Sequence, residues 1–212
     1  MIALDNLVIK SFRKKAQFML GFFLLISSCE QLRYTNDING YTMGTSYSIK
    51  IIDNKILDLN DVSNEIDLVL NKINKQMSTW DQESEISKLN RNISDSIIKV
   101  SADLYSVIKE SIKISKKTQG AFDVTIFDLM SLWGFGPKAN NNYPSDSVIL
   151  NALKSSGWEK LILKDKGLSK KNPNLKLDLN AIAKGYAVDK VHQKILEMGF
   201  KDVFIEIGGE IK

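Results

Sequence analysis

The residues from Leu175 to Asp189 carry the pattern in this chain that most directly suggests chemistry. Leucines alternate with polar residues over Leu175–Leu179, which predicts a half-buried strand, and Asn180 suits the N-cap of a helix that follows at once. The start of a helix offers free backbone N–H groups, which attract anions. Asp178 has the wrong charge for such a site unless a cation or a ligand donor is present, and Lys184 supplies a positive charge one turn into the helix. We therefore predict an anion-binding junction, with an ordinary corner carrying an exposed ion pair as the alternative.

The elements on either side of this junction predict a parallel piece of sheet. Val203–Ile207 alternates in the same way as Leu175–Leu179, and it is followed by Gly208 and Gly209. A strand, a helix and a second strand would form a βαβ unit with a right-handed crossover. The glycine spacing is not that of a Rossmann or P-loop fingerprint. Gly185 inside the helix costs about 1 kcal/mol relative to alanine, which predicts the close approach of a neighbour.

Two further segments combine turn residues with aromatic side chains. Met77–Asn90 has the composition of a turn but contains Trp80, which is either an anchor for the loop or a platform for a flat ring. Ser84 predicts the cap of a short helix in the same segment. Gly120–Pro137 begins with a connection that ends at Asp123, and this aspartate suits the cap of the segment that follows. Its aromatic residues and glycines are more typical of a packed corner than of a cofactor site.

The remaining patterns predict the scaffold. Tyr41–Ile51 alternates like a strand, and Gly44 interrupts it as a bulge or as a place where a ligand approaches the backbone. Apolar residues at helical spacing predict helices that begin near Asp61, Ser101 and Ser145. A strand and two turns then lead to the junction: Trp158–Leu163, Asp165–Gly167 and Lys171–Asn174.

Composition excludes several classes of function. The 212 residues suit one domain, and the net charge of +4 comes from interspersed charges without a basic stripe, so we expect no nucleic acid partner. A single cysteine and a single histidine exclude a Cys/His zinc site and an intrachain disulfide. His192 would have to serve any histidine-dependent triad, but its place within the predicted helix favours a solvated side chain.

The N-terminus predicts export. The basic residues Arg13–Lys15 precede an apolar run, Phe18–Ile26, which is too short for a membrane span and is followed by two serines and Cys29. This order resembles a bacterial lipoprotein signal. By that resemblance residues 1–28 are a signal peptide, Cys29 is lipidated and anchors the chain to a membrane facing the periplasm, and residues 29–39 are a tether. A plain secretory signal and a buried core cysteine are the alternatives.

Five motifs occur in order along the chain: Tyr41–Thr45, Met77–Asn90, Gly120–Asp123 with Leu132–Pro137, Leu177–Asp189 and Ile207–Glu210. Together they resemble the ApbE family of FAD:protein FMN transferases, which are flavin-transferring bacterial lipoproteins. The resemblance extends from Tyr41 to the last residue and makes residues 40–212 one domain. It implies an α+β fold, an ApbE-like (T-fold-like) mixed sheet with packed helices.

The resemblance also implies a reaction and its partners. The family transfers FMN from FAD to a Thr or Ser hydroxyl of a partner protein, releases AMP and depends on Mg²⁺. The main-chain carbonyl of Ala181 would be one Mg²⁺ ligand, in keeping with the preference of this ion for oxygen. The residues that would contact FAD are Met43, Trp80, Ala121, Phe122, Asp123, Asp178 and Lys184.

The chain departs from the family pattern at its end. Members of the family continue past the position of Lys212, and that part carries further Mg²⁺ ligands and a His-Ile-Asp-Pro-type segment tied to activity. We therefore expect this chain to be the N-terminal portion of a transferase, with a fold incomplete at the C-terminus, and we identify no catalytic residue in it. Two other hypotheses are an FAD-binding fragment or carrier that does not transfer flavin, and a tethered structural or interaction module.

Overall fold

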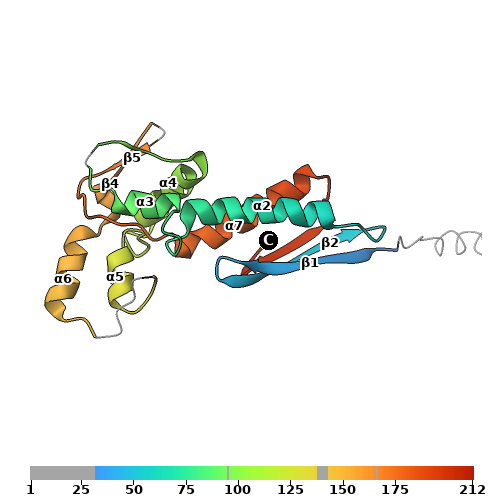
Figure 1. Ribbon diagram of the computed structural model, residues 1–212, viewed down its shortest axis with the longest axis horizontal. Helices are drawn as coiled ribbons and strands as arrows, with labels where there is room; N and C mark the ends of the chain where they lie inside the picture. The colour runs from blue at the N-terminus through green and yellow to red at the C-terminus, as the bar shows by residue number, and fades with distance from the viewer. Residues whose placement is uncertain (1–31, 95, 138–142, 166) are drawn as a thin grey trace, which may run out of the picture.

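The computed structural model describes residues 32–94, 96–137, 143–165 and 167–212. These residues form an elongated molecule, with a sheet and two long helices towards one end and a group of shorter elements towards the other (Figure 1). Within these ranges no helix has both the length and the apolar character needed to cross a membrane. The predicted signal peptide, residues 1–28, and the predicted lipidation site, Cys29, lie outside the described residues.

The larger sheet contains four strands in the order β1-β2-β6-β7. Every neighbouring pair in it is antiparallel. The strands are β1 (Tyr34–Thr42), β2 (Thr45–Asp53), β6 (Val203–Ile207) and β7 (Glu210–Ile211). The α+β class and the strand at Val203–Ile207 are therefore confirmed, whereas the predicted parallel pairing is wrong.

The segment Leu175–Leu179 belongs to neither sheet, which is why no βαβ unit forms. It runs into the helix as an irregular segment, yet Leu175, Leu177 and Leu179 are all fully buried. The alternation of leucines thus correctly predicted that these side chains are buried, but the prediction that the segment pairs as a strand is wrong. We call residues Leu175–Leu179 the site loop.

A two-residue turn explains a second difference from the sequence pattern. Met43 and Gly44 have positive φ values of 51° and 74°, and they join β1 to β2 as a tight hairpin. The predicted single strand with a bulge at Gly44 is therefore two strands. Residues 34–39, which we expected to belong to a tether, form most of β1.

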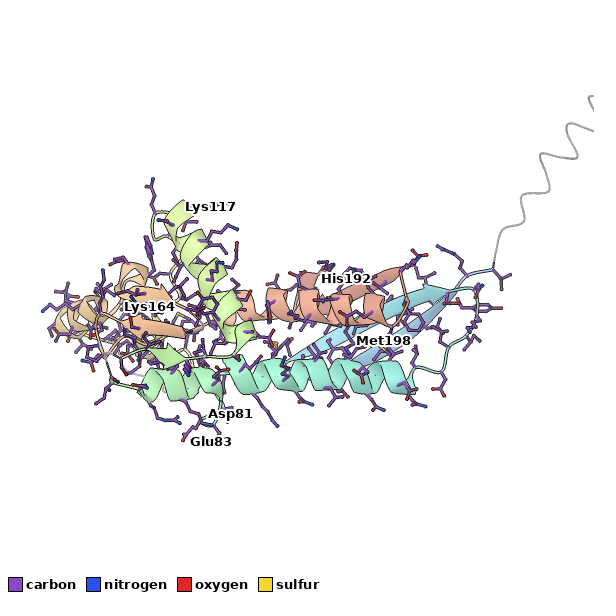
Figure 2. All side chains as sticks on the ribbon, turned by 90° about the horizontal axis from the view of Figure 1, so that it is seen from above. Asp81, Glu83, Lys117, Lys164, His192 and Met198 are labelled. Atoms are coloured by element: carbon purple, nitrogen blue, oxygen red, sulfur yellow. The ribbon has the colours of Figure 1, made fainter. Side chains whose placement is uncertain are left out.

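Two long helices lie along the inner face of the larger sheet (Figures 1 and 2). They are α2 (Asn60–Met77) and α7 (Asn180–Glu197). Their apolar faces join the sheet in one core, as the helical periodicity predicted. Asp61 does not cap α2, because the N-cap residue is Leu59 and the nearby carboxylate of Asp58 accepts the N–H of Asn60 instead.

The shorter elements form the other end of the molecule. Ser84 and Ser101 cap their helices as predicted, since each hydroxyl accepts a backbone N–H of the first turn. The predicted strand at Trp158–Leu163 begins later, because its first three residues form a 3-10 turn. The helices are α3 (Glu85–Arg91), α4 (Ala102–Lys117), α5 (Phe127–Leu132), α6 (Asp146–Ser155) and η1 (Trp158–Lys160). A second, three-stranded antiparallel sheet has the order β3 (Ile98–Lys99), β5 (Gly167–Lys170), β4 (Leu161–Lys164).

Candidate functional site

The N-terminus of α7 is closed by its own residues. The carboxylate of Asp178 accepts the backbone N–H of Asn180 at 2.8 Å and its side-chain amide at 3.1 Å. The N–H groups of Ile182 and Ala183 both bond to the carbonyl of Leu179, at 3.0 and 2.8 Å. The prediction that Asn180 caps this helix is therefore wrong, and these three N–H groups are not free to bind an anion.

Asp178 is a buried carboxylate without a cationic partner. Asp178 is only 8% exposed, and it forms no ion pair with any described residue. Burial raises the pKa of Asp178, and the hydrogen bond from Asn180 opposes that rise only in part. Lys184 does not approach it, because the ammonium donates to the carbonyl of Gly208 at 3.3 Å. The structure thus contradicts the alternative of an ordinary corner with an exposed ion pair, and it leaves a partly compensated charge in the site loop.

The site loop lies against the connection that precedes α5. The N–H of Asp178 donates to the carbonyl of Val124 at 2.8 Å. Asp123 itself turns towards backbone groups: its carboxylate accepts the N–H of Thr125 at 2.8 Å and the N–H of Trp158 at 3.0 Å. Asp123 therefore does not cap the helix that follows, contrary to what the sequence suggested, because α5 begins at Phe127 with Ile126 as its N-cap residue. The backbone segments that carry Asp123 and Asp178 are hydrogen-bonded to each other, but the carboxylates of the two residues accept hydrogen bonds from different groups.

The turn at Gly208 lies close both to Lys184 and to the start of β2, just after the hairpin turn at Met43. Gly208 donates its N–H to the carbonyl of Ser46 at 3.1 Å. A Cβ on Gly208 would lie 2.7 Å from the Thr45 side chain and 3.3 Å from that of Lys184. This close approach, together with a φ of 56°, requires glycine.

The loop after α2 carries Trp80 and joins the same region. Asn74, in the last turn of α2, donates to the hydroxyl of Thr42 at 3.1 Å and so links this helix to the Met43 turn. Trp80 is 64% exposed, which removes the interpretation that it is a buried anchor and leaves its face available to a flat ligand. Phe122 is partly buried against the core, whereas Ala121 is exposed.

A groove of about 570 Å³ runs between α4 and α7. Of the eight residues predicted to contact FAD or metal, Ala181 lines it. Gly185 also lines the groove, and a Cβ there would meet no atom within 4 Å. The prediction that Gly185 admits a close neighbour is therefore wrong for the described residues, since this glycine faces open space. Other lining residues are Ser106, Lys109, Glu110, Tyr186, Asp189 and Glu210.

Metal-binding side chains do not gather around Ala181 in the described part of the chain. No group of three or more His, Cys, Asp or Glu side chains there has the arrangement of a metal site. His192 lies along α7, well away from Asp81 and Glu83 of the Trp80 loop (Figure 2). The described residues therefore offer no cluster of acidic side chains, His or Cys for a metal ion.

Sequence patterns missed the polar residues that hold the site together. Asn90 binds both backbone groups of Leu177, and Asp103 accepts hydrogen bonds or ion pairs from α2 and α7. Asn90 does fall within one of the five motifs, on the buried side of a predicted helix, and that position was the available signal. Asp103 gave no signal, because an aspartate in a first helical turn is common.

These observations define the class of the protein: an α+β fold in which separated loops gather at the N-terminal end of one helix that packs its apolar face on the core. Sequence comparison then gives the family. The model of the ApbE family matches residues 43–212, and the chain belongs to this family.

Relatives and solved structures agree with that assignment. The chain is 40% identical to an FAD:protein FMN transferase of Vibrio cholerae over 195 residues, covering 91% of this chain and 58% of the relative. It is 35% identical to that of Haemophilus influenzae over 197 residues, covering 89% and 57%. The structure of the flavin transferase ApbE from Vibrio cholerae superposes with a TM-score of 0.83 at 39% identity, covering 85% of this chain and 59% of that one. The chain thus spans a little over half the length of the relatives it matches.

Proposed function

We propose that this chain binds FAD around the N-terminal end of α7 and forms part of an enzyme that transfers FMN from FAD to a Thr or Ser hydroxyl of a partner protein. The observation that carries the proposal is the convergence of the Met43 turn, the Trp80 loop, the Asp123 connection and the site loop on one end of α7. Relatives named FAD:protein FMN transferase support the reaction.

Each part of the site suits one part of FAD. Trp80 offers an exposed aromatic face for the isoalloxazine ring. Lys184 is bonded only to a carbonyl and forms no ion pair among the described residues, so its charge is available to the diphosphate. The buried carboxylate of Asp178 suits a donor on the ligand. Met43, Ala121, Phe122 and Asp123 complete the proposed contact set.

The proposed reaction is displacement at phosphorus. The acceptor hydroxyl oxygen forms a bond to the phosphorus of the FMN half, the bond to the AMP phosphate breaks, and the hydroxyl proton is released. Mg²⁺ is the metal we expect, with the carbonyl of Ala181 as one ligand. Because the described residues do not complete its coordination shell, no step is assigned to the metal.

Titration of FAD into the purified chain, with and without Mg²⁺, tests the proposal. Trp80→Ala should weaken binding about tenfold, the loss of one stacking contact. Phe204→Ala is the matched control, since Phe204 is an exposed aromatic residue on the outer face of β6 and should leave binding unchanged. Saturating FAD that produces no binding signal would reject the proposal.

A second measurement separates transfer from binding alone. The chain is incubated with FAD, Mg²⁺ and a protein acceptor that bears the flavinylated Thr or Ser, and the intact mass of the acceptor is measured. A covalent FMN adduct that survives acid denaturation supports transfer. Flavin that binds but leaves on denaturation supports the alternative, an FAD-binding fragment or carrier.

We also propose that the protein is exported and anchored through a lipid on Cys29 to a membrane facing the periplasm. The support is the order of basic, apolar and small residues that ends at this cysteine. Labelled fatty acid should be incorporated into the wild-type chain in bacterial cells and not into Cys29→Ser. Equal labelling of both would reject the anchor.

A further inference from the structure

We propose that Asn90 and Lys170 are positioning residues, which hold the site loop extended without a partner strand and so fix Asp178 opposite the Trp80 loop. We call Asn90 and Lys170 the clamp. That the clamp affects FAD binding rests on the function proposed above. Neither residue was among the predicted contacts, and both reach the loop from other elements.

Asn90 replaces the neighbouring strand that the site loop lacks. Its side-chain amide donates to the carbonyl of Leu177 at 2.8 Å, and its carbonyl oxygen accepts the N–H of Leu177 at 2.7 Å. This pair of bonds is the exchange that a paired residue in an antiparallel strand would make. Asn90 is 8% exposed and Leu177 is fully buried, so water cannot replace these bonds without opening the core.

Lys170 holds the beginning of the same loop. It is the last residue of β5 and is 2% exposed. Its ammonium donates to the carbonyl of Leu175 at 3.1 Å and to the carbonyl of Asn92, just after α3, at 2.7 Å. Burial, and then the charge of Lys176, lowers the pKa of Lys170 to about 8. A lysine kept buried at this cost, with two backbone carbonyls as partners, acts as a bridge between α3 and the site loop.

Helix α3 therefore connects two parts of the site. At its N-terminus the hydroxyl of Ser84 caps the helix and donates to the carbonyl of Ser78 at 2.6 Å, which fixes the loop that carries Trp80. At its C-terminal end Asn90 binds the site loop that carries Asp178. A seven-residue helix thus sets the relative position of the proposed ring contact and the proposed diphosphate end.

The chain offers a matched control for Asn90. Asn36 is also a buried asparagine, 6% exposed, whose side chain binds backbone: it donates to the carbonyl of Ile51 at 3.3 Å and accepts the N–H of Leu57 at 2.8 Å. It lies near the start of β1, at the end of the molecule opposite α3 (Figure 1). The Asn36 amide also donates to the carbonyls of Tyr34 at 3.4 Å and Lys55 at 3.3 Å. Asn36→Ala therefore removes at least as many main-chain hydrogen bonds as Asn90→Ala, but at a place remote from the site.

The experiment measures FAD affinity and amide hydrogen exchange in the wild type and both variants, at a temperature where all three are folded. Both variants should melt at a lower temperature. Asn90→Ala alone should raise the Kd for FAD about tenfold or more, as loss of residues that orient direct ligands does elsewhere. It alone should also accelerate exchange at the amides of Leu177 and Asp178 by about tenfold.

Two results would overturn the proposal: equal FAD affinity in Asn90→Ala and Asn36→Ala, or unchanged exchange at Leu177 and Asp178 when Asn90 is removed. If the wild type binds no FAD, the proposed function fails, while the exchange data still decide whether the clamp exists. If Asn90→Ala does not fold, Lys170→Met replaces it, with faster exchange at Leu177 as the expected result and unchanged exchange as the contrary one.

Discussion

At the scale of single residues, the site is marked by side chains held in unfavourable states. Asp178 is buried without a cationic partner, and burial raises its pKa. Met43 has a φ of 51°, a conformation that costs a non-glycine residue about 1 kcal/mol or more. Strained backbone and buried charge of this kind cluster at functional sites, although structural positions can also carry them. Both residues also belong to the proposed FAD contacts.

Asp178→Asn should raise the stability of the protein at pH 7 and weaken FAD binding by about tenfold or more, the loss of one charged hydrogen bond. The raised pKa means that the ionised carboxylate costs stability above that pKa. As the pH falls through it, the wild type becomes protonated and the difference between the two proteins narrows. Thermal unfolding between pH 4 and 7 and FAD titration measure both effects.

Asp128→Asn is the control for that substitution. Asp128 pairs with Lys176 of the same loop at 2.9 Å but does not reach the end of α7. It should lose a little stability and keep FAD affinity. Equal loss of affinity in both variants would show that Asp178 acts only by shaping the loop.

Met43→Asn should change stability little and lower FAD affinity about tenfold. Asparagine relieves about 1 kcal/mol of strain at a positive φ, but it gives up apolar packing of similar size. Gln119→Asn is the matched control, because Gln119 has a φ of 53° at an exposed position after α4. It should stabilise the protein and leave FAD affinity unchanged. Denaturant unfolding and FAD titration measure the pair, and retained affinity in Met43→Asn would contradict the assigned contact.

At the scale of elements, one carboxylate joins three helices beside the groove. Asp103, at the start of α4, accepts the hydroxyl of Tyr186 on α7 at 2.6 Å. On α2, it forms an ion pair with the ammonium of Lys72 at 2.6 Å and accepts a hydrogen bond from the side-chain amide of Gln76 at 3.3 Å. Burial would raise the pKa of Asp103, but the bonds from Lys72, Tyr186 and Gln76 outweigh it and lower the pKa to about 2.

Asp103→Asn should destabilise the protein by about 2 kcal/mol at neutral pH, because the bonds to charged and buried partners weaken. The unfolded carboxyl titrates at 3.8, so the contribution of Asp103 is complete above that pH and is lost as the pH falls towards about 2. Urea unfolding at pH 7 and at pH 3 measures this. Glu110→Gln, which breaks only an exposed pair with Lys113 on the same helix, should have little effect.

The elements also show what the sequence predicts and what it does not. Helices with a 3.6-residue apolar period and serine caps, such as those after Ser84 and Ser101, are local and were predicted correctly. The polar composition of residues 34–39 predicts a tether, because Thr35, Asp37 and Asn39 face solvent on the outer side of the sheet. The alternating leucines of the site loop predict a strand, but side chains distant in sequence, rather than a neighbouring strand, bond to its backbone.

The candidate site could be predicted only in part for the same reason. The strand-helix pattern and the family resemblance both pointed to Asp178 and Lys184. However, N–H groups at the start of α7 are already bonded, and the alternative, an exposed ion pair between these two residues, does not form. The contacts that decide the site, such as the bond from Asp178 to Val124 and the clamp from Asn90, join residues far apart in the chain. No periodicity reports such contacts, because each depends on how the whole chain packs.

At the scale of the whole molecule, the proposed site lies at the junction between the larger sheet with its two long helices and the group of shorter elements. The end of α2, the Met43 turn and the start of α7 all face the group of shorter elements (Figure 1). The larger sheet and its two helices supply a rigid core, and α3 with the site loop joins the shorter elements to it. The structure of the flavin transferase ApbE from Vibrio cholerae superposes on this fold over 85% of the chain.

The most direct test of the account is to locate FAD on the folded chain by backbone amide chemical shifts, recorded as FAD and Mg²⁺ are added. The largest shifts should fall on residues 43–44, 121–123 and 178–184 and on the indole N–H of Trp80. Shifts confined to α6 or to the outer face of the larger sheet, or no shifts at saturating FAD, would contradict it.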